Sequence, residues 1–160
     1  MKKKLESVTF DPSFTKNLRI AIVRTTYYKD LIDNLESYAK KTLMESGVKS
    51  ANIETFTVPG SWEIPVMAQT AAESKKFDAI IAFGILVKGE TYHFFQISNE
   101  VGRALMQISI DYAIPVGFEV LSVDSLKQAE DRAGKDNYNK GIEAANAVLQ
   151  TLLTLKQIHQ

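Results

Sequence analysis

A short polar turn followed by a histidine is the part of the sequence best suited to chemistry. Lys88–Thr91 combines a cation, a flexible glycine backbone and a hydroxyl, and His93 comes two residues later. Gly89 either only shapes the turn or lets backbone amides point at a phosphate. His93 is either an ordinary surface or packing histidine or a group that transfers protons near neutral pH. Together these residues predict an anion site with an acid–base side chain beside it.

The segments on either side of this turn predict how it is held. Ala79–Val87 is almost wholly apolar, as expected for a strand that is covered on both faces. After the turn, apolar residues recur at the spacing of one helical face: Phe94, Ile97, Val101, Leu105 and Ile108. Parallel α/β proteins hold anionic ligands where the carboxyl end of a strand meets the amino end of a helix. The turn is expected at such a junction.

The same alternation of strand and helix runs along most of the chain. The predicted strands are Leu18–Val23, Ile53–Val58, Phe77–Phe83 and Pro115–Val123. The predicted helices run from about Asp30 to Ser46, from a cap at Ser61 to about Ser74, from Tyr92 onward, from a Ser125–Gln128 capping box to Gly134, and through Ile142–Leu153. Strict alternation implies right-handed crossovers and a parallel sheet. The predicted fold class is α/β, a three-layer α/β/α sandwich with a four-stranded, parallel, flavodoxin-like sheet.

The first part of the chain lacks this alternation. Residues 1–17 are expected to form an amino-terminal arm, and residues 18–160 a single α/β domain. Ser7–Phe10 has a β-like pattern, so the arm is either disordered or adds a strand to the sheet edge of a neighbouring subunit. The Lys2–Lys4 cluster is expected to be a solvated tail.

Composition and charge argue against several classes of function. At 160 residues and 45% hydrophobic content, the chain can bury one substantial core. Its 19 basic and 19 acidic residues cancel, so no net charge favours nucleic acid. It has no cysteine and only two histidines, which argues against a disulfide and against a structural zinc site. No signal peptide or bilayer-length apolar run occurs, so we expect a cytoplasmic protein without a membrane partner.

Polar residues also follow the other predicted strands. Arg24–Tyr28 follows the first strand, Ser61–Glu63 the second and Ser122–Asp124 the fourth. Trp62 is either a core aromatic or a platform for a ligand ring. Glu63 either complements the positive end of a helix dipole or accepts hydrogen bonds from a ligand. Because the carboxyl ends of parallel strands share one edge of a sheet, these segments are expected to converge on one crevice with the turn after the third strand.

Two later cations, Arg132 and Lys140, are either solvated at the surface or in contact with a ligand. A helix that begins after Ser125 carries Arg132 about 10 Å along its axis, away from the sheet edge. A ligand of Arg132 is therefore expected to belong to a neighbouring subunit. No G-x-G-x-x-G, P-loop, H-E-x-x-H or G-x-S-x-G motif occurs. The residues indicate a cofactor-free enzyme or binding protein for a phosphate-bearing or aromatic ligand.

The chain resembles the 6,7-dimethyl-8-ribityllumazine synthases of riboflavin biosynthesis. The resemblance covers Leu18–Leu155 and rests on short motifs in the family's order: Val58–Pro65, Gly84–His93, Ile114–Val116, Gln128–Gly134 and Asn139–Gly141. It implies a transferase that condenses 5-amino-6-(D-ribitylamino)uracil with 3,4-dihydroxy-2-butanone 4-phosphate. The reaction releases phosphate and water and needs neither a metal nor an organic cofactor. The alternative is a flavin- or lumazine-binding carrier or shell protein without efficient turnover.

The resemblance also implies roles for individual residues. His93 would be the proton-transfer residue. Phosphate binding would fall to Gly89, Glu90, Thr91 and Arg132. Contacts to the pyrimidine and ribityl groups would fall to Tyr27, Ser61, Trp62, Glu63, Leu86, Val87, Lys88, Phe118 and Lys140. Three of these residues match groups that the adjacent subunit supplies in the family: Phe118, Arg132 and Lys140.

Several positions depart from the family pattern. Phe95 stands where an acidic residue is usual, Lys88 replaces an arginine, and Glu119 stands where glycine is typical. Thr25–Thr26 and Lys135–Tyr138 also differ from the usual family residues. A lysine cannot reproduce the two-pronged hydrogen bonding of an arginine. These departures bear on rate and ligand preference more than on the class of protein.

The resemblance also bears on assembly. Members of the family form homopentamers, and some build hollow icosahedral shells of sixty subunits. Members that remain pentameric often carry an insertion before the last helix, and none is evident between Gly134 and Lys140. The resemblance therefore implies a homopentamer, permits a 60-subunit shell, and makes riboflavin synthase a candidate partner. The amino-terminal arm would pair with a neighbour's sheet.

Overall fold

The apolar run that precedes the polar turn forms the middle of the sheet. In the computed structural model, which describes residues 8–160, this run is β3 (Ala79–Val87), and its first seven residues are buried. A strand without polar side chains is stable only where both of its faces are covered. β3 pairs with a parallel neighbour along each edge, so it occupies a central position.

Three further strands complete the sheet. They are β1 (Ile20–Thr25), β2 (Ile53–Val58) and β4 (Val116–Val123). The spatial order is β2-β1-β3-β4, and every neighbouring pair is parallel. β2 has the predicted bounds, β3 coincides with the apolar run Ala79–Val87 rather than with Phe77–Phe83, and β1 begins and ends later than predicted. The predicted α/β class with a four-stranded parallel sheet is confirmed.

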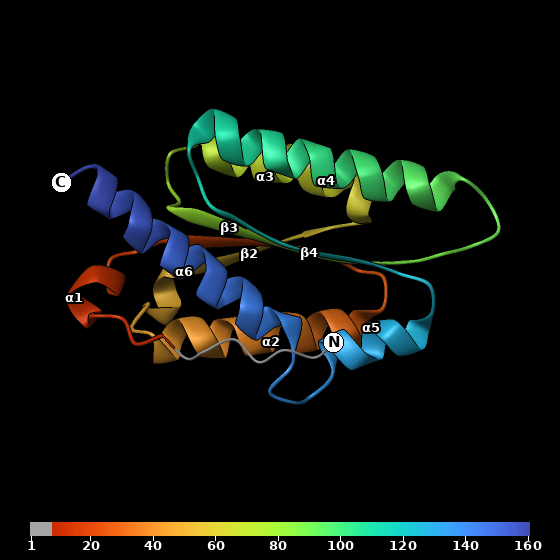
Figure 1. The fold of residues 1–160 in the computed structure, drawn as a ribbon, viewed down its shortest axis with the longest axis horizontal. Coiled ribbons are helices and arrows are strands. Elements are labelled where there is room, and N and C mark those ends of the chain that lie inside the picture. The colour runs from red at the N-terminus through yellow and green to blue at the C-terminus, as the bar shows by residue number, and fades with distance from the viewer. Residues whose placement is uncertain (1–7) are drawn as a thin grey trace.

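Helices cover both faces of this sheet (Figure 1). α3 (Ile64–Glu73) and α4 (His93–Tyr112) lie on one face, and α2 (Lys29–Glu45), α5 (Leu126–Ala133) and α6 (Lys140–Ile158) lie on the other. Two 3-10 helices, η1 (Ser50–Asn52) and η2 (Ser61–Glu63), precede β2 and α3. This is the predicted three-layer arrangement. Among residues 8–160, no helix is both long and apolar enough to cross a bilayer.

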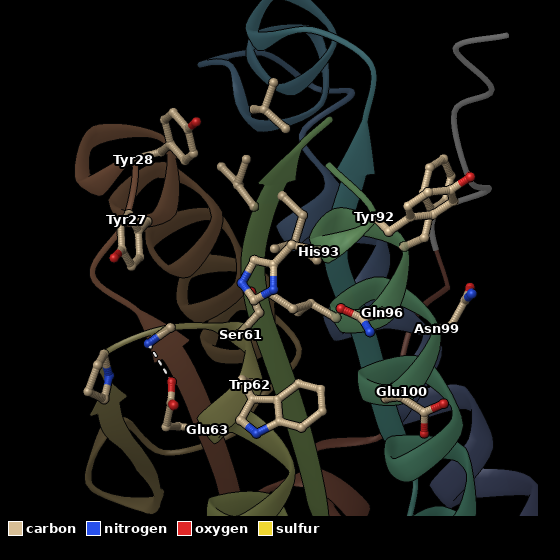
Figure 2. Close-up of a pocket in the computed structure, with 17 residues that line it drawn as sticks. Tyr27, Tyr28, Ser61, Trp62, Glu63, Tyr92, His93, Gln96, Asn99 and Glu100 are labelled. Atoms are coloured by element: carbon tan, nitrogen blue, oxygen red, sulfur yellow. Dashed lines mark hydrogen bonds between the residues drawn. The ribbon is translucent and has the colours of Figure 1, made fainter. Parts of the chain in front are cut away.

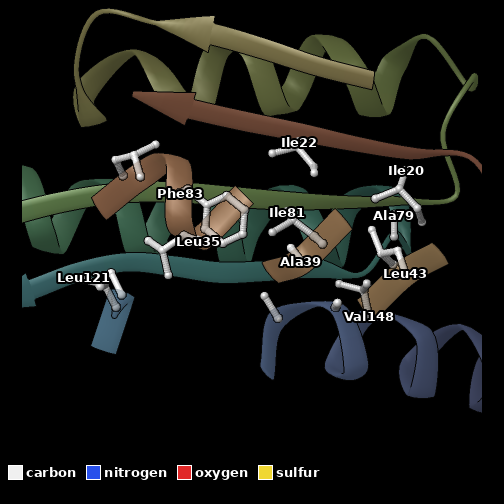
Figure 3. Packing of buried hydrophobic residues seen from close by; sticks show 14 of the residues in the cluster. Ile20, Ile22, Leu35, Ala39, Leu43, Ala79, Ile81, Phe83, Leu121 and Val148 are labelled. Atoms are coloured by element: carbon white, nitrogen blue, oxygen red, sulfur yellow. The ribbon is translucent and has the colours of Figure 1, made fainter. Parts of the chain in front are cut away.

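Each face of the sheet packs on its own core, because successive side chains of a strand point to opposite faces. On the side of α2 and α6, the core contains the strand residues Ile22, Ile81 and Phe83 with Leu35 and Val148 (Figure 3). The core on the side of α3 and α4 includes Val23, Ile80, Ala82, Ala68 and Leu105. The two cores together hold the strand ends at one edge in fixed positions.

The predicted helix signals at Gly47 and Ser125 are confirmed. Gly47 follows α2 with φ +99°, a left-handed conformation that glycine adopts without a steric penalty. Ser125 Oγ accepts the backbone N–H of Gln128 at 3.4 Å at the start of α5. The Gln128 side chain accepts in return the backbone N–H of Asp124, at 3.0 Å. The helix after β4 therefore starts at a defined point.

The chain before β1 contains a helix that was not predicted from the sequence. α1 (Pro12–Thr15) is capped by the Asp11 carboxylate, which accepts a backbone N–H at 2.8 Å. Phe10 is buried in the core beside α2. The described part of the predicted β-like segment forms no strand. Ser7 and the Lys2–Lys4 cluster lie outside the described residues.

α6 and α2 approach each other at a glycine. A Cβ added to Gly141 would lie 2.1 Å from the carbonyl oxygen of Leu35 and 3.0 Å from the amide nitrogen of Ala39. Asn139 caps α6, and its Oδ1 accepts the Gly141 N–H at 2.8 Å. Backbone contact and cap therefore explain two residues of the Asn-Lys-Gly motif, and they set the position of Lys140 between them.

A mostly covered carboxylate lies on the edge strand β4. The Glu119 carboxyl interacts electrostatically with two charged side chains of α6, Lys140 and Glu143. These two form an ion pair with each other. Within residues 8–160, no hydrogen bond or ion pair to the Glu119 carboxyl is found. Burial raises the pKa of this carboxyl to about 8; the Lys140 charge opposes the rise and the Glu143 charge adds to it. Glu119 is therefore neutral at pH 7.

We expect Gly141→Ala to destabilise the chain by about 3 kcal/mol, because the methyl group has no room and α6 must move away from α2. Urea unfolding followed by circular dichroism measures the change. Gly102→Ala is the matched control, since its Cβ would meet only the Phe118 ring, at 3.6 Å. Alanine in the middle of α4 should stabilise by about 0.5–1 kcal/mol. Equal losses in both variants would contradict the close approach.

We also expect Glu119→Gln to stabilise the fold more as the pH rises. Between the ordinary pKa of 4.5 and about 8, the folded chain holds a proton that the unfolded chain has released. The native glutamate therefore weakens the fold as pH increases across this window. The gain in unfolding free energy should be larger at about pH 8 than at about pH 5, by about 1–3 kcal/mol. Urea unfolding at both pH values tests this, and a gain independent of pH would refute it.

Candidate active site

A cavity of about 1170 Å³ opens where the strands end (Figure 2). Its walls come from the segments after β1 and β2, from the last residues of β3, and from the first turns of α4. Of the segments predicted to converge on one crevice, those after the first and second strands contribute to the lining, whereas Ser122–Asp124 after the fourth strand does not. The lining contains these residues that were expected in the site: Tyr27, Ser61, Trp62, Glu63, Leu86, Val87 and His93.

Two tyrosines at the β1–α2 junction form one wall. Tyr28 has φ 54° and ψ 50°, a left-handed conformation that costs a non-glycine residue roughly 1–2 kcal/mol. No side chain caps α2 at this bend, and the Tyr28 carbonyl accepts the backbone N–H of Ile32 at 3.1 Å. The bend leaves Tyr27 66% exposed at the cavity, with Tyr28 above it (Figure 2). An exposed aromatic ring of this kind suits stacking on a planar ligand.

The segment after β2 forms the floor, and its conformation differs from the prediction. The expectation that Ser61 caps α3 is wrong. Ser61 is buried at the start of η2, and Glu63 Oε2 accepts the Gly60 backbone N–H at 3.0 Å (Figure 2). A Cβ at Gly84 of β3 would lie 2.7 Å from Ser61 Oγ. A glycine in β3 is therefore what allows η2 to lie against the sheet.

Trp62 and His93 face each other across the cavity (Figure 2). Of the two sequence readings of Trp62, the structure rules out the core position, since 58% of the side chain is exposed. His93 is the first residue of α4, one position after the predicted start at Tyr92, and it is also exposed. An aromatic surface thus lies opposite a side chain that can transfer protons.

The polar turn borders the cavity rather than lining it. Val87 before the turn and Tyr92 after it are lining residues, whereas Lys88, Gly89, Glu90 and Thr91 are not. The Lys88 backbone N–H donates to the Val123 carbonyl at 2.8 Å, which fixes the start of the turn to the end of β4. A Cβ at Gly89 would meet no atom within 4 Å. The turn is therefore open to a ligand.

Three more of the expected residues lie away from the cavity of this chain: Phe118, Arg132 and Lys140. Phe118 is 47% exposed on the edge strand β4. Arg132, in the last turn of α5, donates from Nη1 to the Gln128 carbonyl at 2.9 Å. Lys140 pairs with Glu143 at the start of α6. The expectation that Arg132 does not reach its own crevice agrees with this position.

The α4 wall supplies residues that sequence reasoning missed: Tyr92, Phe95, Gln96, Asn99 and Glu100. Gln96, Asn99 and Glu100 follow His93 at helical spacing, so the histidine and these polar side chains share one side of α4, and Tyr92 directly precedes the helix (Figure 2). This periodicity was available in the sequence, but the prediction followed only the apolar face. The wall adds amide and carboxylate groups that can bind a polar substituent.

Arg24 shows how strand alternation keeps a charge out of the site. Although it directly precedes the residues of the cavity wall, it points to the α2 face. There its guanidinium contacts Asp33 and Glu36, each at 2.6 Å. The Glu36 carboxylate also accepts the Thr55 hydroxyl at 2.7 Å. The cavity therefore gains no cation from β1.

The cavity combines a stacking surface, a proton-transfer group and a neighbouring turn with free backbone. Within residues 8–160, no three His, Asp or Glu side chains come together in a way that could hold a metal ion. The arrangement suits a planar ring bound between Tyr27 and Trp62, with an anionic group at the turn. Such a site can align two organic substrates and move protons between them.

Comparison with known proteins shows the family of the chain. Residues 17–156 match the sequence model of the 6,7-dimethyl-8-ribityllumazine synthase family. The chain is 38% identical over 143 residues to the 6,7-dimethyl-8-ribityllumazine synthase of Nitratidesulfovibrio vulgaris strain Hildenborough, covering 89% of this chain and 92% of that protein. It is 37% identical over 142 residues to the enzyme of the same name from Campylobacter jejuni strain RM1221, with the same coverage. The chain belongs to the 6,7-dimethyl-8-ribityllumazine synthase family.

Proposed function

We propose that the protein condenses 5-amino-6-(D-ribitylamino)uracil with 3,4-dihydroxy-2-butanone 4-phosphate to give 6,7-dimethyl-8-ribityllumazine, phosphate and water. Family membership supports the reaction. The observation that carries the proposal at residue level is the single cavity that joins Tyr27, Trp62 and His93 beside the Lys88–Thr91 turn. No cofactor is required, because both substrates already contain the reacting amine, ketone and phosphate ester.

The reaction needs little from the protein beyond alignment and proton transfer. The aryl amine attacks the ketone, and loss of water gives an imine. Removal of a proton next to the imine then expels phosphate with its bonding electrons. Elimination leaves an enol, which takes up a proton at its terminal carbon and becomes a ketone. The ribitylamino nitrogen attacks this new carbonyl, and loss of a second water completes the ring. Holding two reactive molecules in register can account for several kcal/mol of the barrier.

We assign the residues of the site as follows. His93 transfers the protons in the imine and elimination steps. Tyr27 and Trp62 enclose the pyrimidine ring. Ser61, Glu63, Leu86, Val87 and Lys88 contact its substituents and the ribityl chain. The backbone of Gly89, Glu90 and Thr91 binds the phosphate, as free N–H groups before a helix do.

The remaining groups are proposed to come from a neighbouring subunit. Phe118, Arg132 and Lys140 lie outside the cavity of their own chain and would complete that of the next one, with Arg132 on the phosphate. A homopentamer would provide such sites, and a larger shell is compatible with it. Large apolar side chains on α3 and α4 support a subunit contact: Val66, Met106 and Ile110 are each more than 60% exposed.

Mixing both substrates with the purified protein should produce the coloured lumazine well above the uncatalysed background. His93→Ala should lower kcat by about 10²-fold, since general acid–base catalysis is typically worth that much or more. His159→Ala is the matched control, because His159 follows the last helix, far along the chain from the site. Ligand binding without condensation by the native protein would instead support the carrier alternative.

The shared site can be tested by mixing two impaired variants and assaying them at a butanone phosphate concentration well below KM. Arg132→Ala should raise KM for the butanone phosphate by about tenfold or more, because a charge-assisted contact to phosphate is lost. Unfolding and refolding His93→Ala together with Arg132→Ala in equal amounts should restore about a quarter of native activity, since that fraction of interfaces joins two intact half-sites. Two His93→Ala preparations mixed in the same way are the control. No recovery would show that each chain uses its own Arg132.

A further inference from the structure

The Lys88 side chain lies over an aromatic ring of α4. Its Nζ is 5.4 Å from the centroid of the Phe95 ring. Lys88 directly follows β3, and Phe95 is in the first turn of α4. The contact therefore joins the two ends of the segment 88–95. A lysine over the face of a ring is attracted by the negative charge of the π system. The contact therefore connects the start of the turn to the first turn of α4.

The Phe95 ring is itself held by other aromatic side chains. The Phe94 ring packs edge-on against it at 5.2 Å between centroids, and the Tyr92 ring lies at 6.5 Å. Phe95 and Tyr92 also line the cavity. The platform beneath the ammonium is thus supported from two sides, and it lies between the cavity and the turn.

In the described part of the chain, Lys88 interacts with a ring rather than with an acid. Among the described residues 8–160, no carboxylate forms an ion pair with its ammonium. The first helical hydrogen bond of α4 runs from Gln96 N–H to the Tyr92 carbonyl, at 3.1 Å. The backbone N–H groups of His93, Phe94 and Phe95 precede it, and in an α-helix such groups have no partner within the helix. A full positive charge therefore lies at a helix amino end that attracts anions.

We propose that Phe95 is a positioning residue that holds the Lys88 ammonium at the Gly89–Thr91 turn, so that Lys88 binds the phosphate of the phosphorylated substrate. This proposal rests on the proposed function and reassigns Lys88 from the pyrimidine to the phosphate. It also relates two of the departures from the family pattern. An acid at position 95 would pair with the cation at position 88, whereas a neutral ring orients the cation and leaves its charge available.

Binding of inorganic phosphate, followed by ³¹P NMR, tests the proposal without any need for turnover. Lys88→Met should weaken phosphate binding about five- to tenfold, because one charge-assisted contact is lost. Phe95→Asp should do the same, since the new carboxylate neutralises the ammonium. Phe95→Leu should weaken binding about two- to fourfold, and Phe95→Tyr, which retains the ring, should restore it. Phe14→Leu is the matched control: it removes a lysine–ring contact of the same kind, Lys156 Nζ at 5.3 Å from the Phe14 centroid, and should leave phosphate affinity within about twofold of native because neither residue lines the cavity.

Steady-state kinetics separates positioning from general damage to the site. Lys88→Met and Phe95→Leu should raise KM for the butanone phosphate and leave KM for the pyrimidine substrate unchanged. The double variant should bind phosphate no more weakly than Lys88→Met alone, because the ring acts only through the ammonium. Unchanged phosphate affinity in Lys88→Met, or equal affinity in Phe95→Leu and Phe95→Tyr, would overturn the proposal. Absence of lumazine synthesis by the native protein would refute the proposed function, and the phosphate titration would still decide the role of Lys88.

Discussion

The burial of β3 on both faces is the constraint on which the rest of the structure depends. β3 carries no polar side chain, so the first polar side chain on this segment follows Val87. The same burial requires a glycine at position 84, where Ser61 lies against the strand. The hydrogen bond from the Lys88 N–H to the Val123 carbonyl then fixes the start of the turn to the packed sheet. The positions of the site residues therefore depend on how the sheet beneath them packs.

Features with a local cause could be predicted from the sequence. The apolar run of β3, the alternation of elements and the start of α4 at His93 all follow from periodicities of two and 3.6 residues. The left-handed bend at Tyr28 and the helix α1 could not be predicted in this way. The bend is held by tertiary structure against the preference of its own residue, and four residues are too few for a periodic signal. Ser61 was misassigned because its environment is set by Gly84, which is distant in the sequence.

The site was predictable only in part, for a different reason. Tyr27, Trp62 and His93 meet because topology brings strand ends to one edge, and that rule needs no coordinates. Arg132 and Lys140 lie at helix ends beyond that edge, and nothing within one chain says what they meet. Both side chains are partly exposed, and under the proposed assembly they would gain a ligand only in contact with a second copy of the chain.

The exposure of Trp62 has a consequence for spectroscopy. In most small proteins the indole is in the core, and its emission follows global unfolding. Here the single tryptophan is 58% exposed in the wall of the cavity, on a short 3-10 helix outside both cores. Its fluorescence therefore reports solvent access and occupancy at the site, while circular dichroism reports the sheet and helices. A difference between the fluorescence and circular dichroism transitions along a denaturation curve would measure local unfolding of the cavity wall, separate from unfolding of the sheet and helices.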